Sequence, residues 1–251
     1  MTHRASPLLV LALALLPSAA AAQRPEPAVG PGRWRPAPRE MRSIGSTGGS
    51  IALAFPQGEF AHYVRLGGGL NGFAALKLDQ AGTVSIRLDG TFLLYGSETR
   101  RVPLSSTVNL VTVDVTTSNQ ILSMGIGPQL AVTRGWIRPY ATGSVGFSYF
   151  WTSSSVRGVD NVEPFATSTN FGDGALSWRG GGGVRVQVTR GRKPLWLDLA
   201  AHYVRNGRVS YLRPGGIDAS VSPPRVNPIE SETNLWLVEL GFVTSLQVPR
   251  R

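Results

Sequence analysis

The feature that most constrains the fold of this chain is an alternation of apolar and polar side chains with a period of two residues. In the segment 82–95, GTVSIRLDGTFLLY, Ile86 and Leu88 share one parity, and Arg87 and Asp89 share the other. Successive side chains of a strand point to opposite faces, so this pattern predicts a strand with one apolar and one polar face. Eight segments follow the pattern, and they cover residues 44–55, 65–78, 82–95, 119–132, 136–151, 175–189, 194–205 and 233–246.

The connections between these segments alternate in length. Three are short and contain or adjoin glycine, at residues 79–81, 133–135 and 190–193. The other four are longer, at roughly 56–64, 96–118, 152–174 and 206–232. Short turns at one end and long loops at the other are typical of membrane barrels. We therefore predict an all-β fold, an eight-stranded antiparallel up-and-down transmembrane β-barrel with short periplasmic turns and long extracellular loops.

The direction of the apolar face separates a membrane barrel from a soluble one, because it points outward to lipid in the first and inward in the second. Two features favour the membrane: charged residues occupy mid-strand positions on a glycine-rich polar face, and aromatic residues stand on the apolar face near the long loops. Amphipathic rings favour the headgroup level of a bilayer. The aromatic belt is predicted to comprise Trp151, Trp178, Tyr203 and Trp236. A soluble barrel is the alternative.

The N-terminal segment has the pattern of a cleaved secretory signal peptide. Residues 1–22 combine Arg4, an apolar run and an A-x-A site that ends at Ala22. The apolar run is too short to span a bilayer as a helix. The predicted organisation is a signal peptide at 1–22, a Pro/Arg-rich leader at 23–42, the barrel at 43–247 and a basic tail at 248–251.

The interior of the predicted barrel holds charges of both signs. An eight-stranded barrel is just wide enough to be filled by its own side chains, and isolated charges there would be costly. Across the 190–193 turn, the hairpin register places Arg185 opposite Asp198. We predict a lumen plugged by paired charges, with separate hydration of each charge as the alternative. The predicted network comprises Lys77, Arg87, Asp89, Arg185, Asp198 and Glu239.

The local strings IALAFPQGEF, GIGPQL and IRPYATGSVGFSYF are similar to first-hairpin and central-hairpin sequences of the small outer-membrane β-barrel family of Gram-negative bacteria, the OmpA/OmpX-like group. The resemblance covers nearly the whole chain after residue 22. It implies a location in the cell outer membrane and insertion by the barrel-assembly machinery. Members usually end on an aromatic residue, whereas here Phe242 is followed by further residues that end in VPRR.

The residues carry no signature of catalysis, cofactor binding or metal binding. No cysteine is present, no GxSxG motif occurs, and the only histidines after residue 22 are His62 and His202. The predicted function is a structural, adhesive or ligand-docking role of the extracellular loops. The alternatives are a narrow channel for small solutes and an outer-membrane lipid-modifying enzyme that uses His62 or His202.

The partners expected from the sequence follow from the distribution of charge. The net charge is +10, and the basic residues gather in the leader, the short turns and the C-terminus. This favours outer-membrane lipid, with cell-wall polymer or anionic lipid at the periplasmic rim, over nucleic acid. The expected oligomeric state is a monomer.

Overall fold

The computed structural model describes residues 41–103, 112–158, 166–191, 193–211, 217–218, 225–226 and 228–249. The predicted signal peptide, the leader up to residue 40, and the last two arginines lie outside the described residues.

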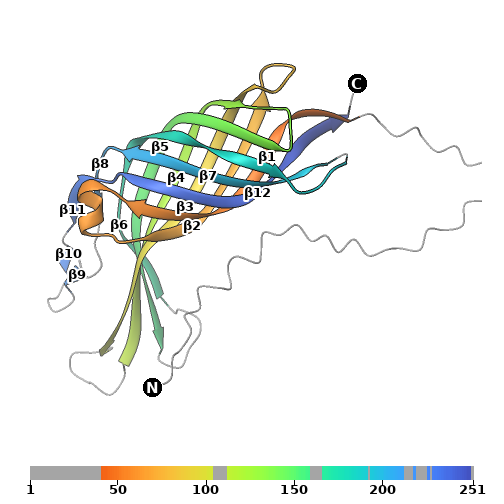
Figure 1. The fold of residues 1–251 in the computed structure, drawn as a ribbon. Helices are drawn as coiled ribbons and strands as arrows, with labels where there is room; N and C mark the ends of the chain where they lie inside the picture. The colour runs from red at the N-terminus through yellow and green to blue at the C-terminus, as the bar shows by residue number, and fades with distance from the viewer. Residues whose placement is uncertain are drawn as a thin grey trace, which may run out of the picture. The chain divides into compact units, whose positions relative to one another are not determined.

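Eight long strands close into one barrel, in which every neighbouring pair is antiparallel (Figure 1). The spatial order is β1-β12-β7-β6-β5-β4-β3-β2, so each strand lies beside its neighbours along the chain and β1 closes on β12. The predicted fold class is therefore confirmed. The barrel strands are β1 (Met41–Pro56), β2 (Gly67–Lys77), β3 (Val84–Pro103), β4 (Thr112–Ala131), β5 (Ile137–Gly158), β6 (Ala166–Gln187), β7 (Leu195–Asn206) and β12 (Leu235–Pro249).

The barrel is longer at both chain ends than the alternation indicates. Strand β1 begins at Met41, so residues 41–42 belong to the barrel rather than to the leader. Strand β12 ends at Pro249, so residues 248–249 belong to the barrel rather than to the tail. Their backbones pair in register, with Met41 opposite Pro249. Backbone hydrogen bonding continues here beyond the apolar alternation, which marks only the part of a strand that faces lipid.

The three short turns depend on glycine. Gly82, Gly135 and Gly191 all adopt positive φ angles, of 75°, 92° and 128°. Residues with a Cβ rarely adopt such angles, whereas glycine does so at no steric cost. The turns predicted at residues 79–81, 133–135 and 190–193 therefore lie where the structure reverses the chain.

The outer face of the barrel is apolar and the inner face is polar. Leu199 of β7 and Leu240 of β12 are 57% and 46% exposed, whereas Arg87 of β3 is 1% exposed. The soluble alternative is thereby excluded, since it requires the opposite orientation. The outward apolar band includes Ile51, Leu53, Leu76, Leu88, Leu122, Met124, Ile126, Val145, Phe147, Leu176, Trp178, Leu199, Trp236, Val238, Leu240 and Phe242.

The segments predicted as long loops contain structure of their own. A 3-10 helix, η3 (Gly58–His62), follows β1, and the chain between β7 and β12 forms two small antiparallel sheets (Figure 1). Among the described residues, no helix is long and apolar enough to cross a membrane. The short strands are β8 (Arg208–Tyr211), β9 (Ile217–Asp218), β10 (Arg225–Val226) and β11 (Ile229–Glu232), and they pair as β8 with β11 and β9 with β10.

Strands β3 to β6 continue past the ends of β2 and β7 toward the long loops. Pairing of β2 with β3 ends at Gly68 and Leu94, but β3 and β4 stay paired as far as Pro103 and Thr112. We call this four-stranded part the sheet extension. It comprises residues 96–103, 112–119, 152–158 and 166–174.

Candidate functional site: the barrel lumen

Six buried charges cross the middle of the lumen, and we call them the charge belt. Three are cationic and three are anionic, so their formal charges cancel. Removing such groups from water is costly unless each one is paired and hydrogen-bonded. The charge belt comprises Arg87, Arg179, Arg185, Asp89, Asp198 and Glu239.

One half of the belt is organised around Gln129 of β4. Its side-chain oxygen accepts hydrogen bonds from Arg87 Nη1 and Arg185 Nη2, both at 3.1 Å. Arg87 Nε also donates to Asp89 Oδ1 at 2.8 Å, two residues along the same strand. Across from it, Asp198 Oδ2 accepts from the Tyr140 hydroxyl at 3.1 Å, and its other oxygen lies 3.9 Å from Arg185 Nε. Each charge therefore has a partner of opposite sign.

Aromatic rings reinforce this half of the belt. The guanidinium carbon of Arg87 lies 3.7 Å from the centroid of the Phe73 ring, and that of Arg185 lies 4.4 Å from the Tyr140 ring. A cation over a ring face is attracted by the ring quadrupole, more so away from water. The rings thus stabilise the arginines and fill space that water would otherwise occupy.

The other half of the belt is organised around Glu239 of β12. Arg179 Nη2 donates a short hydrogen bond to Glu239 Oε1, and Asn71 Nδ2 donates to Glu239 Oε2 at 3.0 Å. Arg179 Nη1 lies 3.8 Å from Asp89 Oδ1 and so links the two halves. His202 of β7 is fully buried, with Nδ1 3.3 Å from Glu239 Oε1. Side chains of β2, β6 and β7 thus converge on one carboxylate of β12.

The register of the β6–β7 hairpin agrees with the sequence argument. The Cα atoms of Arg185 and Asp198 are direct partners across the two strands. Arg87, Asp89 and Glu239 are also buried in the lumen, as their parity predicts.

The placement of Lys77 in the network is wrong. Lys77 has interior parity but lies at the last residue of β2, where its side chain is exposed. Its Nζ donates to Ser43 O at 3.4 Å and to Ser43 Oγ at 3.1 Å, and no carboxylate lies within ion-pair distance among the described residues. At a strand end, water solvates the ammonium, so burial does not force it to pair.

Arg179 takes the place in the network that the sequence assigns to Lys77. The alternation starts β6 at about residue 175, which would put Arg179 at a wet strand end. In the structure β6 starts at Ala166, and Arg179 lies mid-strand with its side chain 9% exposed. The interior parity of Arg179 could have indicated its place in the network. The predicted start of β6 at residue 175 was too late, so Arg179 was assigned to a strand end.

Two inward glycines leave room for the belt. Gly181 and Gly183 lie on β6 between Arg179 and Arg185. A Cβ on Gly183 would lie 2.9 Å from the Tyr140 hydroxyl, and one on Gly181 would lie 2.7 Å from the Cα of His202. Side chains at these positions would displace the groups that hold Asp198 and Glu239.

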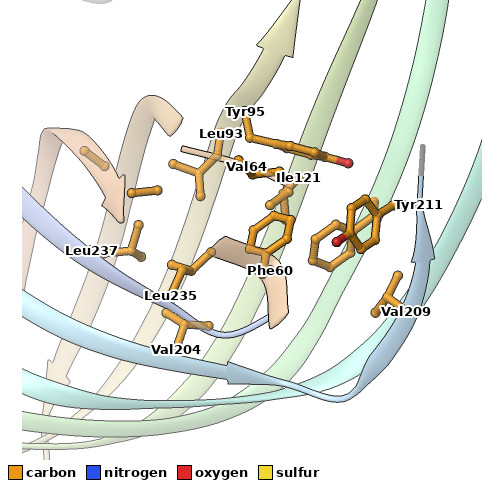
Figure 2. Close-up of a cluster of buried hydrophobic side chains, with 13 residues drawn as sticks. Phe60, Val64, Leu93, Tyr95, Ile121, Val204, Val209, Tyr211, Leu235 and Leu237 are labelled. Carbon is orange, nitrogen blue, oxygen red and sulfur yellow. The ribbon is translucent and has the colours of Figure 1, made fainter. Parts of the chain in front are cut away.

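An apolar cluster lies inside the barrel at the long-loop end, and we call it the aromatic plug (Figure 2). Phe60 of η3 lies at its centre, and its ring makes edge contacts with Tyr95, Phe150 and Tyr211 at centroid distances of 5.6, 6.4 and 5.3 Å. The cluster comprises Ala52, Ala54, Phe60, Val64, Leu93, Tyr95, Ile121, Phe150, Val204, Val209, Tyr211, Leu235 and Leu237.

The sequence reasoning missed the aromatic plug, although a signal was present. Near the long loops the alternation breaks down, because both parities become apolar in FLLY at 92–95 and in LWL at 235–237. Apolar residues of interior parity there require an apolar partner inside the barrel. Phe60 and Tyr211 supply it from loops, and no strand periodicity could place them.

The four residues predicted as an aromatic belt lie on the outer side of the barrel. Trp178 and Trp236 are exposed on the outer face, and the Trp236 ring lies 5.3 Å from that of Tyr203. Trp151 stacks on Tyr149 with a centroid distance of 5.8 Å. Their level in the bilayer stays a prediction.

The two histidines lie in different environments. His62 is exposed in η3, whereas His202 is enclosed in the charge belt. Within the part of the chain that the structure describes, no group of three or more histidine, cysteine, aspartate or glutamate residues could hold a metal ion.

A closed antiparallel barrel with an apolar exterior and a polar interior is the architecture of outer-membrane proteins, because every backbone group is paired and the outer band faces acyl chains. The chain is therefore an outer-membrane β-barrel.

Comparison with known proteins identifies solved barrels of low sequence identity. No protein-family model and no curated protein sequence matches the chain. Neisserial surface protein A is 14% identical with a TM-score of 0.44, over 81% of this chain and 97% of that one. The attachment invasion locus protein Ail of Yersinia pestis is 11% identical with a TM-score of 0.43, over 81% and 99%. The N-terminal β-barrel domain of Pseudomonas aeruginosa OprF is 13% identical with a TM-score of 0.33, over 82% and 100%.

Proposed function

We propose that the protein is a non-conducting outer-membrane barrel that acts at the cell surface through its sheet extension, in an adhesive, ligand-docking or structural role. The observation that carries this proposal is the pair of successive closures in the lumen. The charge belt fills the middle, and the aromatic plug fills the long-loop end. These two filled sections favour the part beyond the membrane as the surface available for function.

The sheet extension suits surface contacts because its strands are paired and its described side chains are mostly polar. Hydroxyl groups bond across its strands, between Thr99 and Thr116 at 2.9 Å and between Thr117 and Ser154 at 3.0 Å. Arg101 Nε and Asp114 Oδ1 form an exposed ion pair at 2.9 Å. Binding residues held by a rigid scaffold lose little conformational entropy on contact. We therefore assign the docking surface to this extension.

Planar-bilayer recording tests the closed lumen. The purified full-length protein should give no steady single-channel steps, whereas an open barrel under the same conditions gives steps of constant size. Steady steps from the wild type would reject the proposal in favour of a narrow channel for small solutes.

Shortening the sheet extension tests the surface role. A variant that joins residues 96 and 119 by a Gly-Asn-Gly turn should keep the heat-modifiable gel mobility of a folded barrel. Cells that display this variant should show less cell–cell aggregation, and less retention on immobilised glycans, than cells that display the intact protein. Equal aggregation and retention would overturn the assignment to the extension.

We expect no enzymatic activity. His202 is enclosed by the charge belt, and its Nδ1 lies 3.3 Å from the carboxylate of Glu239, which already binds Arg179. A nucleophile and its base need mutual access to a substrate. Lipid turnover by reconstituted protein should be absent. A turnover that disappears on replacing His62 or His202 by alanine would support the lipid-modifying alternative instead.

A further inference from the structure

A cavity of about 330 Å³ opens at the short-turn end of the lumen, on the periplasmic side of the charge belt. Three cationic side chains line it, those of Lys77, Arg138 and Arg185. Hydroxyl and amide groups, including those of Ser43 and Gln129, complete the polar part of the wall. None of the lining residues is acidic. The cavity is therefore a cationic space inside a low-dielectric barrel.

Two of the cations come from directly paired positions on neighbouring strands. Arg138 of β5 and Arg185 of β6 are Cα partners, and both side chains line the cavity. Like charges that face each other across a strand pair are destabilising. Such an arrangement persists when something of opposite sign lies between or beside the two groups.

The described carboxylates of the lumen reach Arg185 but leave Arg138 without an anion. Asp198 is 3.9 Å from Arg185 and bonds Tyr140 with its other oxygen. Arg138 donates from Nε to the Gly135 carbonyl at 3.1 Å and stacks 4.1 Å above the Trp196 ring. Within the described residues, neither Arg138 nor Lys77 has a carboxylate within 4 Å. Three cations thus line the cavity, and one carboxylate, that of Asp198, lies within 4 Å of one of them.

We propose that this cavity binds a phosphate group between Arg138, Arg185 and Lys77. Guanidinium groups match the geometry of phosphate oxygens with paired N–H donors, and a lysine adds a point charge. A phosphate here would replace the repulsion between the two arginines by attraction on both sides.

The size of the cavity limits what the phosphate is attached to. Liquid water occupies about 30 Å³ per molecule, so the space equals roughly ten waters. This accommodates inorganic phosphate or a phosphate ester with a small substituent such as glycerol. Because the cavity opens toward the periplasm, the phosphate has two sources: a soluble ester, or the headgroup of an anionic lipid of the inner leaflet.

Titration calorimetry on the full chain in an uncharged detergent tests the site. Glycerol 3-phosphate, added at constant ionic strength, should bind saturably to the wild type. Arg138→Gln should weaken this binding at least tenfold, whereas Arg208→Gln, which removes an exposed arginine in β8, should leave it unchanged. The absence of saturable binding, or equal binding by Arg138→Gln, would overturn the proposal.

A charge reversal gives an independent readout. Arg138→Glu places a carboxylate opposite Arg185, so it should abolish phosphate binding and raise the urea midpoint of unfolding of the phosphate-free protein. Gel mobility of the folded form shows whether the variant has inserted. A folded Arg138→Glu barrel with an unchanged or lower midpoint would show that the two arginines do not repel, and the argument for a bound anion would fail.

Reconstitution separates the two sources of phosphate. If the ligand is a soluble ester, glycerol 3-phosphate should bind equally in vesicles of phosphatidylcholine and in vesicles that contain phosphatidylglycerol. If it is a lipid headgroup, phosphatidylglycerol should compete and weaken the binding of the soluble ester. Neither outcome depends on the sheet extension, so failure here is distinct from failure of the surface role.

Discussion

The two ends of the lumen are built from the same strands and the same inward parity, yet they have opposite chemistry. At the long-loop end, Phe60 and Tyr211 come from the connections between strands and pack with inward apolar residues of the wall. At the short-turn end, Arg138 and Lys77 line an open cavity. The difference follows from the connections, since a long loop can fold back into the barrel and a short turn cannot reach it.

The comparison also explains where the charges lie. On the side of the belt nearest to the aromatic plug, Arg179 and Glu239 bond directly. At the other end water can enter, and Lys77 stays exposed without a carboxylate among the described residues. The charges deep in the lumen are therefore paired, whereas Lys77 at the short-turn end pairs with no described carboxylate.

The largest loss of stability should come from the removal of one charge of the belt. Glu239→Gln keeps the shape of the side chain but leaves the buried Arg179 with only the carboxylate of Asp89, 3.8 Å away. We expect the free energy of unfolding, measured by urea denaturation in vesicles, to fall by about 3–5 kcal/mol.

A matched control for this variant is Glu230→Gln, which breaks the pair with Arg208, where both side chains are about 60% exposed. Its effect should stay below about 1 kcal/mol, because exposed pairs contribute little. Similar losses for the two variants would contradict the view that the belt is a dry, tightly coupled closure.

The next largest effect should come from the aromatic plug. Phe60→Ala removes the ring at the centre of the cluster, and truncation of a buried phenylalanine costs about 3 kcal/mol or more. Conductance should stay absent, because the charge belt still closes the lumen below. Urea denaturation and planar-bilayer recording on the same preparation check both expectations.

Tyr63→Ala is the control for Phe60→Ala, since Tyr63 follows η3 but is exposed. It should change the unfolding free energy by less than about 0.5 kcal/mol. Steady conductance from Phe60→Ala would mean that the plug alone seals the barrel, and the two-part closure would be wrong.

The smallest effect should come from a short turn. The Val84 and Thr83 N–H groups donate to the Asp79 carboxylate at 2.9 and 3.2 Å, and these bonds lower the pKa of Asp79 from its ordinary value of 3.8. A carboxyl with a depressed folded pKa stabilises the fold above its unfolded pKa, and that stabilisation is lost as the pH falls through the folded pKa.

Asp79→Asn should therefore be less stable than the wild type at pH 7, and the difference should shrink as the pH falls below about 3.8. Urea midpoints measured between pH 2 and 7 test this, with Gln80→Ala in the same turn as the control. A stability difference between the wild type and Asp79→Asn that grows toward low pH would contradict a lowered pKa of Asp79.

The eight strands, their order and the outward apolar face could be predicted from the sequence because lipid imposes a period of two on every segment that crosses it. Ile86, Leu88 and their counterparts must face acyl chains wherever the strand lies in the bilayer. Where a strand continues beyond the apolar band, as in the polar segments 97–101 and 152–155, the constraint disappears. The alternation therefore ended those strands too early, and Arg179 was misplaced as a consequence.

The parity of the chain by itself determined which charges point inward and that Arg185 faces Asp198. Only the tertiary structure decided which of them are paired, because pairing depends on depth within the lumen and on what seals each end. Phe60 reaches the lumen from a loop, and Arg138 faces Arg185 across neighbouring strands at an open mouth. Both placements arise from contacts between residues distant in sequence, and a local alternation holds no information about such contacts.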